Sequence, residues 1–156
     1  MKSLFLTFFF FLFHFCFTQS ANLILQVNGK IIASDFANIY IKFDIDGNSK
    51  NISVNYLPGD LELPEEAWKI INSKPDKKFF LHLDYYTYKN GTQKITNFDI
   101  ELSKYLIEQK YLIADIYDFR DRSYKRKFQH YTDEHFLVQF YYSPANGVHG
   151  IYIPRK

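Results

Sequence analysis

Cysteine is almost absent from this chain. It occurs once in 156 residues, as Cys16 inside an apolar N-terminal run, so no cysteine follows residue 20. The larger part of the chain therefore has no thiol nucleophile, no CxxC redox pair and no Cys-ligated zinc or iron–sulfur site. It also has no disulfide, so we expect packing to supply its stability.

Glycine-rich loops and an excess of one charge are missing too. The six glycines form neither G-x-G-x-x-G nor G-x-x-x-x-G-K-[ST], which excludes the common phosphate loops. Neither G-x-S-x-G nor S-x-x-K occurs, so the sequence predicts no catalytic residue and no cofactor. The chain has 19 Lys and Arg against 17 Asp and Glu, a net charge of +2. We therefore expect no general affinity for nucleic acid.

The N-terminus has the layout of a secretory signal peptide. Lys2 precedes the apolar run Leu4–Phe17, and small or polar residues follow at 18–21. The run is shorter than the roughly 20 residues of a spanning helix. We expect residues 1–20 to be a cleaved signal peptide and 21–156 a single exported domain, periplasmic or extracellular, with no transmembrane span. Cleavage after Thr18, an uncleaved membrane anchor and a lipid-anchored Cys16 are the alternatives.

The exported part reads as short strands separated by turn residues. Asn28-Gly29, Asp46-Gly47, Pro58-Gly59 and Asn90-Gly91 each stand between apolar or alternating runs, which is typical of β-hairpins. The expected strands are 23–27, 30–32, 39–45, 52–57, 79–88, 95–102, 111–117, 136–142 and 148–153.

The sequence pattern of one segment, residues 64–73, predicts a helix. Residues 64–73 begin with proline and two glutamates and stop before Pro75. Both faces of the strand 79–88 carry aromatic residues, so we expect this helix, through Trp68, to cover the second face.

Together these patterns predict an antiparallel β-sandwich with one short helix. The strand Phe98–Leu102, the corner 103–110 and Tyr111 opening the next strand resemble the E–F corner of immunoglobulin-like domains. The Cys…Trp…Cys spacing of true immunoglobulin domains is absent. An up-and-down barrel is the alternative fold.

A basic cluster is the least ordinary local feature of the exported part. It contains five cations within eight residues, namely Arg120, Arg122, Lys125, Arg126 and Lys127. The sequence predicts a hairpin tip there, where the cations either bind an acidic protein or envelope surface or simply remain solvated.

Exposed aromatic residues suggest a second kind of site. Aromatic surfaces can stack on sugar rings, and the candidates are Trp68, Tyr86, Tyr88, Tyr141 and Tyr142. The alternative is ordinary sheet packing, because aromatic residues are favoured in strands.

Three further groups are interpreted as structural. Asp44–Ser49 resembles a calcium loop but lacks the required Gly and Glu, so we expect a hairpin turn. The imidazoles and carboxylates of 130–135 have no metal-binding spacing, and we expect a polar loop. His82 and Asp84 share a strand face, where we expect ordinary polar side chains.

The sequence thus indicates an exported, non-enzymatic binding or accessory module that acts by protein–protein contact. A carbohydrate-binding module is the first alternative, and a hydrolase or metal-dependent enzyme the second. The oligomeric state stays open.

The absence of cysteine makes a direct prediction about stability. Once the signal peptide is removed, the domain has no thiol to oxidise or reduce. The midpoint of thermal unfolding should therefore be the same with and without dithiothreitol. A midpoint that falls in reductant would contradict a cysteine-free exported domain.

Overall fold

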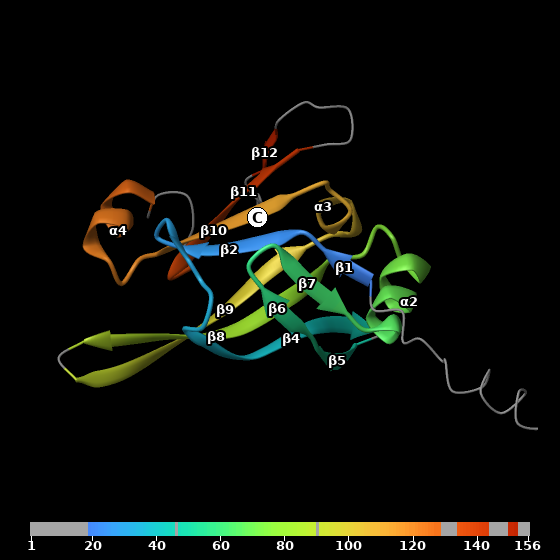
Figure 1. Ribbon diagram of the computed structural model, residues 1–156, viewed down its shortest axis with the longest axis horizontal. Helices are drawn as coiled ribbons and strands as arrows, with labels where there is room; N and C mark the ends of the chain where they lie inside the picture. Colours follow the sequence, from blue (N-terminus) through green and yellow to red (C-terminus); the bar gives the residue numbers. More distant parts are fainter. Residues whose placement is uncertain (1–18, 46, 90, 129–133, 144–149, 153–156) are drawn as a thin grey trace, which may run out of the picture.

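The computed structural model describes residues 19–45, 47–89, 91–128, 134–143 and 150–152 (Figure 1). Twelve strands and three helices lie in these ranges. The strands are β1 (Gln19–Ala21), β2 (Leu23–Val27), β3 (Lys30–Ile31), β4 (Phe36–Ile45), β5 (Asn48–Ser53), β6 (Asn55–Leu57), β7 (Asp60–Leu63), β8 (Phe79–Lys89), β9 (Thr92–Leu102), β10 (Leu112–Asp118), β11 (Phe136–Tyr142) and β12 (Gly150–Tyr152). The helices are α2 (Glu65–Ser73), α3 (Lys104–Ile107) and α4 (Arg122–Phe128).

The strands form a mainly antiparallel β-sandwich, as the sequence predicts. One sheet has the order β12-β11-β10-β2-β3, and the other has the order β5-β4-β8-β9. Figure 1 draws the first sheet above the second. Among the described strands, β9 pairs only with β8 and β12 only with β11, so the expected alternative of a closed barrel is wrong.

A small third sheet, β1-β7-β6, links the two large ones. Only Asn22 separates β1 from β2, and only Val54 separates β5 from β6. Each pair is thus a nearly continuous strand that leaves a large sheet and enters the small one. Strands that change sheets in this way make the corners of sandwiches.

The core lies between the inner faces of the sheets. Alternate residues of β8 and β9 point inward, and their largest fully buried side chains are Phe79, Leu81, Leu83, Phe98 and Ile100. Across the sandwich, β2, β10 and β11 contribute Leu23, Leu25, Ile116 and Phe140. Burial of this much apolar surface is the main favourable term in folding.

The expected hairpins are confirmed, and one strand pair is not antiparallel. Asn28 and Gly29 adopt φ values of 52° and 77° in the turn between β2 and β3, as a two-residue hairpin with Asn-Gly requires. However, β2 runs parallel to β10, with Leu23 opposite Leu112. The two strands are far apart in sequence, and local patterns do not report such a pairing.

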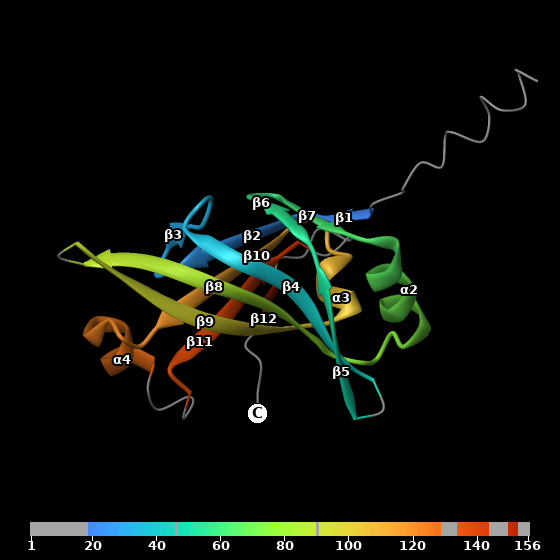
Figure 2. The same ribbon diagram turned by 90° about the horizontal axis from the view of Figure 1, so that it is seen from below.

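The predicted helix forms at Glu65–Ser73, with Pro64 at its N-cap and Glu65 and Glu66 in its first turn. Its expected position is wrong. Instead of covering the outer face of β8, α2 lies beside β1 and β7 at one end of the sandwich (Figures 1 and 2), with Ala67 and Ile71 buried. Two further helices, α3 and α4, occur where no helix was expected.

The corner between β9 and β10 does cross from one sheet to the other. Helix α3 fills it, and the side chain of Ser103 accepts a hydrogen bond from the backbone nitrogen of Leu106. The likeness to the E–F corner of immunoglobulin-like domains therefore extends to its role in joining two sheets.

Substitution of two leucines in the β6–β7 hairpin tests which face of the small sheet packs against the core. Leu61 is 0% exposed and Leu57 is 66% exposed. Leu61→Ala should lower the free energy of unfolding by about 2–5 kcal/mol, because it leaves a cavity. Leu57→Ala, the matched control, should change it by less than about 0.5 kcal/mol. Equal losses in denaturant titrations would contradict this assignment.

Candidate functional site

Four of the five cations of the basic cluster lie on helix α4, and Arg120 lies between β10 and this helix. The Asp121 carboxylate accepts hydrogen bonds from the Ser123 hydroxyl at 2.7 Å and from the Ser123 backbone nitrogen at 2.9 Å. These hydrogen bonds lower the pKa of Asp121. A carboxylate at the start of a helix satisfies free backbone N–H groups and complements the helix dipole. The cluster does lie in the connection between the antiparallel strands β10 and β11, as predicted, but this connection contains a helix instead of a tight turn.

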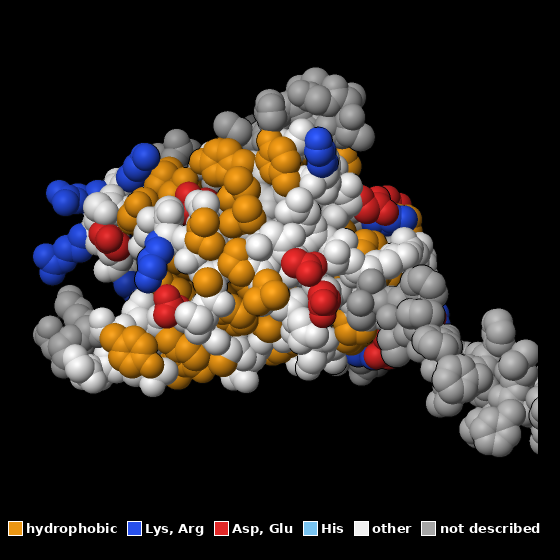
Figure 3. Space-filling model, viewed as in Figure 1, with side chains coloured by type: hydrophobic (Ala, Val, Ile, Leu, Met, Phe, Trp, Pro, Cys, Tyr) orange, Lys and Arg blue, Asp and Glu red, His pale blue; other side chains and the backbone are white. Residues whose placement is uncertain are grey.

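The five cations of the cluster do not play the same part. The guanidinium of Arg120 donates to the buried carboxylate of Asp118, with the Nε atom at 2.7 Å, so its charge is compensated. The other four are exposed and form no salt bridge with any carboxylate that the structure describes. We call Arg122, Lys125, Arg126 and Lys127 the α4 cations. Figure 3 shows Lys and Arg side chains projecting at this end of the molecule.

Aromatic rings hold α4 against the sheet, although the helix has no buried residue. The ring of Tyr117, on β10, stacks on Tyr124 at 5.4 Å and on Phe128 at 4.5 Å between centroids. The Tyr124 hydroxyl also donates to the backbone oxygen of Asn28 at 3.3 Å. The helix is thus fixed by one side, and its cations remain in solvent.

The Tyr117 hydroxyl is itself anchored in the sheet. It lies 3.3 Å from the side-chain oxygen of Gln139 and 3.4 Å from the hydroxyl of Tyr141, both on β11. Burial, and then the hydrogen bond with Tyr141, raise the pKa of Tyr117. Tyr141 therefore helps to hold Tyr117, the ring on which α4 packs.

A projecting hairpin lies at the same end of the molecule as α4. The far halves of β8 and β9 extend beyond the sandwich in both ribbon views (Figures 1 and 2). Tyr88 is 71% exposed and Ile95 is 55% exposed there, and Tyr86 lies opposite Ile95. This end therefore presents cations and apolar side chains together.

The five aromatic candidates do not form one platform. Trp68 lies on α2, half-buried against the core, and its Nε1 atom donates to the backbone oxygen of Gln19 at 3.0 Å. Tyr142 packs edge-to-face on Tyr105, with ring centroids 5.8 Å apart. Tyr86 and Tyr88 lie on the projecting hairpin, and Tyr141 contacts Tyr117 beneath α4. The side chains thus lie in separate places.

A polar cluster on the outer face of the four-stranded sheet has His82 at its centre. Its Nδ1 atom lies 2.6 Å from Asp99, and its Nε2 atom lies 3.2 Å from Asp84. Asn38 and Asn97 donate to the two oxygens of Asp84 at 2.6 and 2.9 Å. The cluster thereby connects β4, β8 and β9.

Tyr40 completes this cluster by stacking on His82, with ring centroids 4.5 Å apart. Burial, and then the charges of Asp99 and Asp84, raise the pKa of Tyr40. Carboxylates can only accept hydrogen bonds, so the imidazole satisfies both contacts when both its nitrogens are protonated. These contacts join three neighbouring strands of the sheet.

Sequence reasoning found only part of this cluster. It paired His82 with Asp84 because strand residues two apart share a face. It missed Asp99, which lies opposite His82 in the register of the predicted β8–β9 hairpin. Counting outward from Asn90-Gly91 would have found that pair. It also missed Asn38, which adopts a φ of 48° at an irregularity in the pairing of β4 with β8.

The two remaining candidate sites are the calcium-like loop at residues 44–49 and the polar segment at residues 130–135. Asp44 lies in the β4–β5 hairpin, as expected. His130 to Asp133 lie outside the described residues, and His135 is exposed. Within the described ranges, no three His, Cys, Asp or Glu side chains are arranged to hold a metal ion.

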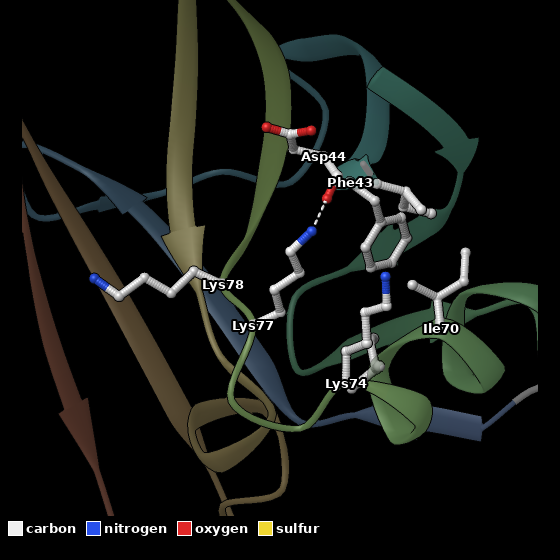
Figure 4. Close-up of a pocket in the computed structure, with 8 residues that line it drawn as sticks. Phe43, Asp44, Ile70, Lys74, Lys77 and Lys78 are labelled. Carbon is white, nitrogen blue, oxygen red and sulfur yellow. Dashed lines mark hydrogen bonds between the residues drawn. The ribbon is translucent and has the colours of Figure 1, made fainter. Parts of the chain in front are cut away.

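A shallow hollow beside α2 offers little room. Phe43 and Ile70 form its apolar wall. Figure 4 shows Lys74 and Lys77 extending into it, and Lys77 donates to the backbone oxygen of Asp44. The lysine side chains thus form part of the lining of the hollow.

Comparisons of the chain with protein-family models, with curated proteins and with solved structures gave no match. Any functional argument must therefore rest on the geometry of the structure.

A membrane-spanning helix would need a long apolar run, and the helices in the described part of the chain are all too short or too polar.

Trp68 separates packing from sugar stacking. Trp68→Ala should lower the free energy of unfolding by about 2–4 kcal/mol, near the lower end of values for large aromatic residues because this ring is only half-buried. Tyr88→Ala, at an exposed position, is the control and should cost less than about 0.5 kcal/mol. An unchanged melting curve for Trp68→Ala, combined with loss of binding on a glycan array, would instead support a sugar platform.

Proposed function

We propose that this protein is an exported binding module that contacts an acidic protein partner through the α4 end. The observation that carries this proposal is a helix with no buried residue that is nevertheless fixed to the sheet by stacked rings. The packing of α4 adds little to the core. What it does is hold four cations in a defined arrangement on the surface.

The composition of this end also favours a protein partner. Arginine and tyrosine are enriched at protein interfaces, and an apolar centre with a charged rim is the usual arrangement. Here the exposed Tyr88 and Ile95 of the projecting hairpin supply apolar area, and the α4 cations supply charge. A carboxylate-rich surface is the complement of such a patch.

The range of this attraction is short. Salt screens exposed charges beyond about 8 Å at physiological ionic strength. The near-neutral remainder of the chain adds no long-range attraction. The α4 cations therefore act on contact, and affinity should fall as salt rises.

Charge reversal tests the proposal. Replacing Arg122, Lys125 and Arg126 together by Glu should weaken binding to immobilised poly-L-glutamate by at least about tenfold, because each lost contact becomes a repulsion. The fold should stay intact, since exposed substitutions cost little. Circular dichroism and the melting midpoint check this second point.

The matched control reverses the charge of three exposed or partly exposed lysines at the other end of the molecule, where α2 and α3 lie (Figure 1). Lys69, Lys104 and Lys110, replaced by Glu, change the net charge by the same amount. This control should keep most of the binding. If both variants lose binding equally, net charge and not the α4 end is responsible, and the proposal fails. The natural partner cross-linked from envelope extract should be lost with the first variant only.

A further inference from the structure

Gln19 has a defined place in the fold. It opens β1 opposite Leu63 of β7, and Ser20 and Ala21 complete the pairing opposite Glu62 and Leu61. Its backbone oxygen accepts the hydrogen bond of the Trp68 indole. The domain boundary expected after residue 20 would divide this strand.

The two expected cleavage sites therefore have different consequences. Cleavage after Ser20 removes two of the three residue pairs that join β1 to β7. It also removes the acceptor of the Trp68 N–H, which fixes α2 to the end of the sandwich. Cleavage after Thr18 leaves every one of these contacts in place.

We propose that the signal peptide is removed between Thr18 and Gln19 and that the new N-terminal Gln19 cyclises to pyroglutamate. This inference rests on the export that forms part of the proposed function. In the reaction, the α-amine of Gln19 attacks its own side-chain carbonyl carbon. A bond forms between that nitrogen and Cδ, the bond from Cδ to the amide nitrogen breaks, and ammonia leaves with the proton from the amine. No oxidant or co-reactant is needed.

The surroundings of Gln19 suit this reaction. Its side chain is exposed and has no hydrogen bond to the residues that the structure describes. The atoms that react are the α-amine and the side-chain amide, so the backbone oxygen bound by Trp68 is not used. The product lacks the charged amine but keeps one N–H at the end of β1.

The mass of the N-terminal peptide tests the proposal. The full chain is expressed in a secreting host, and the exported protein is digested and analysed by mass spectrometry. The expected N-terminal peptide begins at Gln19 and has lost one ammonia. Edman degradation should be blocked until the protein is treated with pyroglutamate aminopeptidase.

A matched variant removes the modification but not the cleavage. Gln19→Ser places a small polar residue at the start of β1 and lacks the side-chain amide, so the exported protein should begin at position 19 with a free amine. A truncated chain that begins at Ala21 should melt about 3–8 °C lower than the chain that begins at Gln19.

The failures are distinguishable. An exported protein that begins at Ala21, or at an uncyclised Gln19, overturns this inference and leaves the binding proposal untouched. A chain that still begins at Met1, or that carries an acylated Cys16, overturns cleavage itself and with it the export part of the proposed function.

Discussion

The continuity of two strands across Asn22 and Val54 is the constraint on which the rest of the structure depends. Each strand leaves a large sheet at that residue and pairs with β7 in the small one. The two large sheets are therefore tied together through backbone hydrogen bonds as well as through side-chain packing. No cysteine follows Cys16, so this link takes the place that a disulfide between sheets has in many secreted sandwiches.

The two ends of the sandwich are built differently as a result. At one end, β1 pairs with β7, and the Trp68 indole of α2 donates a hydrogen bond to Gln19 of β1. These elements cover that end of the core. At the other end, α4 packs on Tyr117 without burying a residue of its own, and the far halves of β8 and β9 project from the sandwich. Side chains that are ordered without stabilising the core are the natural place to look for contact with another molecule.

Local patterns predicted the parts whose cause is local. Asn28-Gly29 specifies its hairpin through positive φ angles, and Pro64 with its glutamates marks the start of α2. The parallel pairing of β2 with β10 was not predicted, because it joins residues almost ninety positions apart. The helix α4 within the β10–β11 connection was not predicted, because this charged stretch carries no apolar periodicity. Its stabilising contact, the ring of Tyr117, belongs to another element.

The sequence by itself determined the class of fold, the absence of cysteine after residue 20 and the location of the basic cluster, because composition, alternation and turn residues act within a few positions. Only the tertiary structure decided which cations are free to bind: Asp118 compensates Arg120, whereas the α4 cations face solvent. It also brought Asp99 and Tyr40 to His82 and made Gln19 part of a strand. These contacts depend on which strands pair across the sheet, and strand pairing is a property of the whole chain.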